Sequence, residues 1–120
     1  MRIEDFREVL KERIRIADEC QDEWDYGIEQ CWKKESEILT EDVQSTIEFL
    51  QNDCTPDEYS WVGEVLSDIV EKTGSFEIVK CYKSLMKKFP EECATYNIVG
   101  YIEDAEAIIK WREEHGENKS

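Results

Sequence analysis

Proline and glycine are scarce in this sequence, which has two prolines and five glycines among 120 residues. Both residue types disfavour helix interiors, so their scarcity predicts an all-α fold in which each of them lies near a helix boundary. Long apolar runs are also missing, because none approaches the roughly 18 residues that cross a bilayer. The N-terminus is charged from the second residue and has no apolar segment typical of a signal peptide, so we expect a cytoplasmic protein.

Residues that usually carry catalysis are few. The five cysteines are an odd number without a C-x-x-C pair, which argues against a disulfide framework and predicts reduced, mostly buried thiols. The single histidine, His115, lies where the chain is expected to fray. No Gly-rich phosphate loop, nucleophile elbow or zinc spacing occurs. These absences predict a protein that is not an enzyme and binds neither a cofactor nor a metal.

Basic residues are outnumbered two to one, with 15 Lys and Arg against 30 Asp and Glu, for a net charge of −15. Such a chain is repelled by DNA and by anionic lipid, which excludes nucleic acid and membrane as partners. The aromatic content of 11%, with four tryptophans, is too high for a disordered acidic tail. The length suits one domain, so we expect a helical domain over residues 1–115 and a frayed tail over 116–120.

Apolar residues recur at helical spacing along most of the chain. The spacing predicts helices over residues 3–17, 28–35, 40–50, 55–74, 75–89 and 91–114. A loop is expected over residues 18–25 and a break near Asn97, and Trp111 is placed on the apolar face of the last helix. Short connections force antiparallel neighbours, so we expect a compact array of about five to six antiparallel helices. Stacked hairpins, as in HEAT or armadillo repeats, are one form of such an array.

The strongest local signal in the chain is Thr55-Pro56-Asp57-Glu58. Thr55 suits the N-cap, proline suits the first helical position, and Glu58 can complete a capping box. Gly74 suits the left-handed conformation that often follows a helix end, and Ser75 can cap the next helix. These residues predict a helix that starts at Pro56 and ends near Gly74.

The acidic excess is uneven along the chain. Residues 18–58 contain 14 acidic residues and two basic ones, Lys33 and Lys34, for a net charge of −12. This density opposes compaction, and its field would attract a basic partner at a high rate. The alternative is a well-solvated acidic surface without a partner.

Two groups of residues are candidates for partner binding. The first interleaves aromatic and acidic side chains, as binding hot spots often do, and consists of Asp22, Glu23, Trp24 and Asp25. The second is a polar stripe on the capped helix, formed by Asp57, Glu64, Asp68 and Glu71 with Trp61 at its edge. The stripe fits a docking surface or the ordinary solvent side of an amphipathic helix, whereas Trp32 is expected in the core.

A metal-dependent enzyme is a competing hypothesis. Glu64 with Asp68, and Glu103 with Glu106, have the one-turn spacing by which all-helical nucleotide pyrophosphatases hold magnesium. The paired E-E-x-x-E and E-x-x-D pattern of those enzymes does not occur at suitable positions. A chain with 30 acidic residues also produces such pairs by chance.

The run TPDEYSWVGEVLSDI over residues 55–69, with Phe89-Pro90-Glu91-Glu92 and Asn97-Ile98, resembles immunity proteins of bacterial polymorphic-toxin and contact-dependent growth inhibition systems. The resemblance covers about residues 30–110 and lies in the overall pattern. It implies a protein that binds a cognate toxin domain, often a nuclease, and blocks it. The acidic excess agrees with it, because carboxylates can stand in for phosphates in a basic substrate cleft. A helical scaffold or adaptor is the second hypothesis, and the oligomeric state stays open.

Overall fold

The computed structural model describes residues 2–20 and 26–115. Every regular element in these ranges is a helix, so the all-α prediction is confirmed. The elements in chain order are α1 (Ile3–Cys20), α2 (Tyr26–Thr40), α3 (Val43–Asn52), α4 (Pro56–Glu64), α5 (Leu66–Thr73), α6 (Phe76–Ser84), the 3₁₀-helix η1 (Leu85–Lys87), α7 (Pro90–Thr95) and α8 (Ile98–Glu114).

The described ranges contain eight α-helices, more than the five to six expected, because predicted helices are divided. Val65 separates α4 from α5, with φ −110° and ψ 9° and its N–H bonded to the carbonyl of Val62. Pro90 starts the short helix α7, and the predicted break at Asn97 separates it from α8. The loop expected over residues 18–25 is wrong at its start, since α1 continues to Cys20, while residues 21–25 lie outside the described residues.

Local capping signals predicted most helix ends correctly. The Thr55 hydroxyl accepts from the Glu58 N–H at 3.1 Å, and the Glu58 carboxylate accepts from the Thr55 N–H at 3.0 Å, which completes the capping box. Gly74 follows α5 with φ +66°, a conformation that favours glycine, and Ser75 caps α6. One start was misplaced: Asp42, and not Thr40, caps α3.

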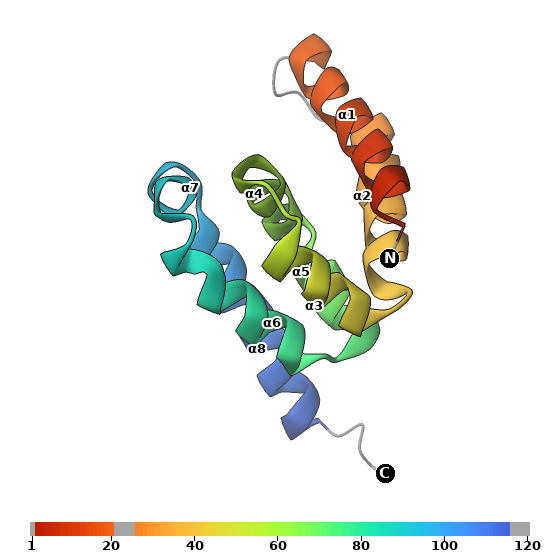
Figure 1. Cartoon of the computed structure of the whole chain (residues 1–120). Helices are drawn as coiled ribbons and strands as arrows, with labels where there is room; N and C mark the ends of the chain where they lie inside the picture. The colour runs from red at the N-terminus through yellow and green to blue at the C-terminus, as the bar shows by residue number, and fades with distance from the viewer. Residues whose placement is uncertain (1, 21–25, 116–120) are drawn as a thin grey trace.

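The helices are arranged in stacked pairs (Figure 1). Helices α1 and α2 pack closely as a hairpin at one side of the molecule, and α6 packs against α8 at the other. Between them, α5 packs against both α2 and α8, while α3 packs against α6. Helices α2, α5 and α8 therefore form one layer, hereafter the α2–α5–α8 layer. No helix of the described ranges is long and apolar enough to cross a membrane.

The core joins α4 to α6 through a pair of tyrosines. The rings of Tyr59 and Tyr82 stack with their centroids 4.2 Å apart. The Tyr59 hydroxyl donates to the Tyr82 carbonyl at 2.8 Å, and the Tyr82 hydroxyl donates to the Tyr59 carbonyl at 2.6 Å. Both side chains are fully buried, so these reciprocal bonds satisfy their hydroxyl groups where water is excluded.

Gly63 in α4 lies against two tyrosine side chains. A Cβ atom at this position would be 2.6 Å from Cδ2 of Tyr101 and closer still to the hydroxyl oxygen of Tyr82. We expect Gly63→Ala to lower the free energy of unfolding by about 1–2 kcal/mol, although alanine is the better helix former, because overpacking in a filled core outweighs propensity. Urea denaturation measures the loss, with Ser67→Ala as the control. Equal or greater stability of Gly63→Ala would contradict the crowding.

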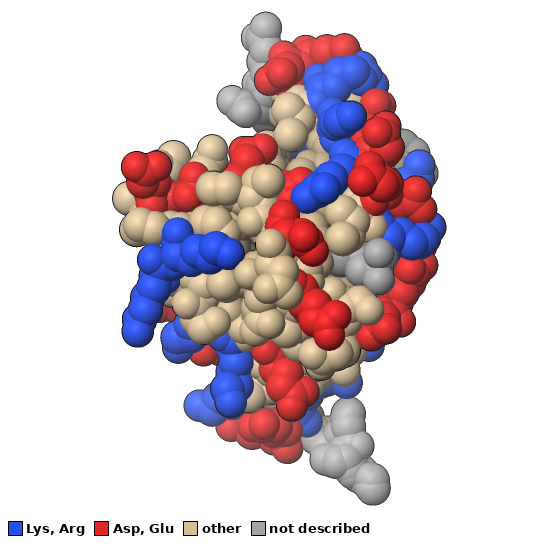
Figure 2. Space-filling view, in the orientation of Figure 1, with Lys and Arg blue, Asp and Glu red and all other residues tan. Residues whose placement is uncertain are grey.

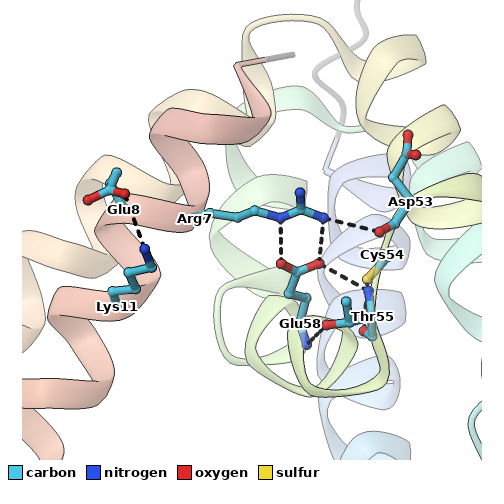
Figure 3. A network of polar contacts seen from close by, with 7 residues as sticks. All are labelled: Arg7, Glu8, Lys11, Asp53, Cys54, Thr55 and Glu58. Atoms are coloured by element: carbon cyan, nitrogen blue, oxygen red, sulfur yellow. Dashed lines mark hydrogen bonds and ion pairs between the residues drawn. The ribbon is translucent and has the colours of Figure 1, made fainter.

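Helix α1 is joined to α4 by long charged side chains (Figure 3). The Arg7 guanidinium contacts the Glu58 carboxylate at 2.7 and 3.3 Å and donates to the Asp53 carbonyl at 3.2 Å. Six residues further along both helices, Arg13 pairs with Glu64. Because both pairs advance in the same sense, α1 and α4 run in the same direction. The antiparallel rule expected from short connections does not apply here, since α2 and α3 lie between these two helices in the chain.

The described cysteines are unpaired thiols. Cys31, Cys54 and Cys81 are buried and Cys93 is half-buried. The pKa of the Cys54 thiol is raised to about 12, mainly by burial and also by the nearby Glu58 carboxylate. A thiol held so far from ionisation is a poor nucleophile, so its contribution is to packing.

Candidate functional site

The described members of the predicted partner-binding set do not form one continuous stripe. Asp22, Glu23, Trp24 and Asp25 lie outside the described residues. The polar stripe is interrupted at Val65, where α4 ends and α5 begins. Asp57 is exposed on the first turn of α4, and Asp68 and Glu71 are exposed on α5, but Trp61 is half-buried and Glu64 points inward.

Glu64 belongs to an internal ion pair. Its carboxylate accepts two hydrogen bonds from the Arg13 guanidinium, at 3.0 and 2.7 Å, and one from the Trp32 indole N–H at 2.6 Å. The guanidinium carbon lies 5.0 Å from the ring centroid of Trp61 and 5.8 Å from that of Trp32, both within cation–π range. Glu64 thus uses its acceptors inside the protein, and its contact with a partner stays a prediction.

Glu35 on α2 completes this arrangement, which we call the Arg13–Glu64 cluster (Arg13, Trp32, Glu35, Trp61 and Glu64). The Glu35 side chain is fully buried, and neither carboxyl oxygen has a hydrogen-bond partner among the described residues. Its pKa is raised to about 8, mainly by burial and also by the Glu64 carboxylate, while the Arg13 guanidinium opposes the shift. At neutral pH Glu35 is thus mostly protonated and uncharged. The charged groups of the cluster are then Arg13 and Glu64, which form one ion pair.

One member of each acidic pair proposed as magnesium ligands is already engaged. Glu64 is bound to Arg13 and Trp32, and Glu106 pairs with Lys83 at 3.1 Å. Within residues 2–20 and 26–115, no group of three or more His, Cys, Asp or Glu side chains is placed to hold a metal ion. In each predicted pair, therefore, only one carboxylate forms no ion pair with another described residue.

A groove of about 520 Å³ runs between α2 and α5, and we call it the α2–α5 groove. Its volume falls within the roughly 300–1,000 Å³ of ligand pockets. It contains Asp68 and Glu71 of the predicted stripe and shares Trp32 with the Arg13–Glu64 cluster. The full lining is Glu29, Gln30, Trp32, Lys33, Ser36, Asp68, Glu71 and Lys72.

A second depression, of about 360 Å³, adjoins the first across α5 and is lined by Glu71, Ile108, Trp111 and Arg112. Glu71 lines both, so the two hollows lie on one face of the α2–α5–α8 layer. Trp111 is 59% exposed, the largest exposed fraction among the big apolar side chains of the described residues. Its ring stacks on His115 with centroids 4.4 Å apart.

Placing Trp111 on the apolar face of α8 was therefore wrong. The buried stripe of this helix is Ile98, Ile102, Ala105 and Ile109. Trp111 follows Ile109 by two residues, or about 200° around the helix, so helical phase alone assigns it to the opposite side. That phase, together with its charged neighbours Lys110 and Arg112, is the signal that could have identified it.

The charged side chains of the α2–α5 groove are not engaged by the part of the chain that the structure describes. Glu29, Lys33, Asp68, Glu71 and Lys72 form no ion pair with any other described residue. Elsewhere most arginines are paired, as on α1, where Figure 2 shows basic and acidic side chains interleaved. Unpaired charges beside partly exposed tryptophans make this face the best candidate for binding another molecule.

This face is thus characterised by its own geometry alone: no protein-family model matches the chain, and no curated protein or solved structure matches it.

Proposed function

We propose that the protein is an immunity protein that neutralises a cognate bacterial toxin domain by stoichiometric binding, and that the exposed face of the α2–α5–α8 layer is its contact surface. The observation that carries the proposal is the combination of five charges in the α2–α5 groove that pair with no other described residue and Trp111 beside that groove. Tryptophan is enriched in the hot spots of protein interfaces, where charged neighbours supply orientation and specificity.

The stacking of the helices supports this choice of face. We propose that α1–α2, α3 with α4–α5, and α6–α8 are three hairpins in a HEAT-like arrangement, since the second helices of successive hairpins pack side by side. Helical solenoids use the extended surface made by one such layer to bind proteins. The two hollows of the candidate face lie between successive members of that layer.

The charge of the whole chain supports a basic partner. A net charge of −15 attracts a basic protein over a distance of about one Debye length, roughly 8–10 Å near physiological ionic strength. A toxin that cleaves nucleic acid has a basic substrate cleft, which carboxylates can cover in place of phosphates. We therefore propose a toxin of the nuclease class acting in the cytoplasm, blocked by a protein that contributes no catalysis.

The test is co-expression with the toxin encoded beside this protein's gene. We expect growth to be restored and the two proteins to elute as one complex. Trp111→Ala should weaken the complex about 30-fold, the effect of losing a hot spot of about 2 kcal/mol. The matched control is Tyr96→Ala, because Tyr96 is 49% exposed but lines neither hollow. Absence of both rescue and complex would refute the proposal, and equal effects of the two variants would refute the choice of face.

A helical scaffold or adaptor is the second candidate function, favoured by the same stacking of hairpins. It places the same face on a partner of a different pathway. A gene that has no toxin gene beside it would favour this candidate, whereas growth rescue favours the first.

A further inference from the structure

We infer that the α2–α5 groove receives an arginine side chain of the basic partner. The inference rests on the proposed function and names the chemical group that this part of the face recognises. It is supported by the chemistry of three parts of the groove: its floor, its rim and its wall.

The floor contains a buried hydroxyl group with an unused bonding capacity. Ser36 lines the groove, is only 2% exposed, and its Oγ has no hydrogen-bond partner among the described residues. A buried polar atom without a partner is unfavourable. A donor that enters the groove from outside would satisfy it.

The rim supplies carboxylates that are free to bind a cation. Asp68 and Glu71 are one turn apart on α5, so their side chains share one face of the helix, and Glu29 faces them from α2. None of the three is in an ion pair with another described residue. A guanidinium has five N–H donors in one plane, enough to bind a carboxylate through two bonds and still donate to Ser36.

The wall is an aromatic ring held in place. Trp32 lines the groove, and the 2.6 Å bond from its indole N–H to Glu64 fixes its orientation. A planar guanidinium stacks on such a ring better than the compact, strongly hydrated ammonium of lysine. The groove's own Lys33 and Lys72 are exposed, so their ammonium groups can stay in water while the pocket between them is filled.

The experiment titrates the protein with the capped peptide acetyl-Gly-Arg-Gly-amide, following the Trp32 indole and Ser36 amide signals by NMR. We expect saturable millimolar binding, at least fivefold weaker binding to Asp68→Asn/Glu71→Gln, and about threefold weaker binding to Ser36→Ala. The control is Glu103→Gln/Asp104→Asn, which removes two exposed carboxylates outside the groove and changes the net charge equally. The analogous lysine peptide should bind at least threefold more weakly, and the uncharged citrulline peptide should not bind.

Equal losses in the two double variants would show non-specific attraction and overturn the inference, as would equal binding of the lysine peptide or no saturable shift. Co-expression separates these failures from failure of the proposed function. If the wild-type protein restores growth and the groove double variant restores it equally well, only the arginine subsite is wrong. If the wild-type protein itself fails to restore growth, the proposed function is wrong.

Discussion

Replacing Glu35 by glutamine is expected to make the protein progressively more stable than the wild type as the pH rises from 5 to 8. Burial holds the pKa of Glu35 at about 8 in the folded state, against an ordinary value of 4.5. The unfolded chain therefore releases this proton at a lower pH than the folded protein does. The stability contributed by protonated Glu35 is complete below pH 4.5 and is lost as the pH rises toward 8.

The expected change in the stability difference between the two proteins is about 3 kcal/mol over this range, since one pKa unit corresponds to about 1.4 kcal/mol. Urea denaturation at several pH values measures it. The control is Glu37→Gln, which neutralises an exposed carboxylate on the same helix and should follow the wild type. Parallel curves for the wild type and Glu35→Gln would show that Glu35 titrates normally.

The Arg13→Ala variant is expected to lose about 3–5 kcal/mol of unfolding free energy. Arg13 is buried and supplies two of the three hydrogen bonds that Glu64 accepts. Its removal leaves the Glu64 carboxylate without a counter-charge in a largely buried site, and breaking a buried ion pair by removing one partner is strongly destabilising. Urea denaturation at pH 7 measures the loss.

Two comparisons identify the cause of that loss. Arg15→Ala removes a neighbouring arginine whose pairs with Glu12 and Glu19 are exposed and screened by water, so it should lower stability far less than Arg13→Ala does. The double variant Arg13→Met/Glu64→Gln removes both buried charges and should recover much of the stability, and it tests the mechanism even where Arg13→Ala does not fold. An Arg13→Ala loss no larger than that of Arg15→Ala would contradict the buried pair.

The helix ends were predictable because their signals are local. Thr55, Gly74, Ser75 and Asn97 act through bonds or dihedral angles within a few residues of their own positions, so the sequence contains the whole cause. The interruption at Val65 has a weaker local cause. Gly63 disfavours helix, but tertiary contacts with Tyr82 and Tyr101 are what require a glycine there.

The candidate site was harder to predict because it depends on contacts between distant segments. Glu64 has the spacing of a solvent-facing residue on a single helix from 56 to 73, and the inward turn appears only once α4 ends and Arg13 approaches from α1. The burial of Glu35 was predictable from the sequence, since this residue falls on the apolar stripe of Ile28, Cys31 and Ile38. An acidic residue in a buried stripe indicates a polar site in the core, but the sequence does not show which distant side chains surround it.

The parallel attachment of α1 to α4 has a consequence for the order in which the molecule opens. In a stack of hairpins each unit is stabilised by its neighbours, and a terminal unit has a neighbour on one side only. The first hairpin meets α4 through the guanidinium groups of Arg7 and Arg13, whereas the inner hairpins interlock through fully buried tyrosines. Backbone amides of α1 and α2 should therefore exchange with deuterium by a partial opening, while α4 and α6 exchange only when the whole chain unfolds.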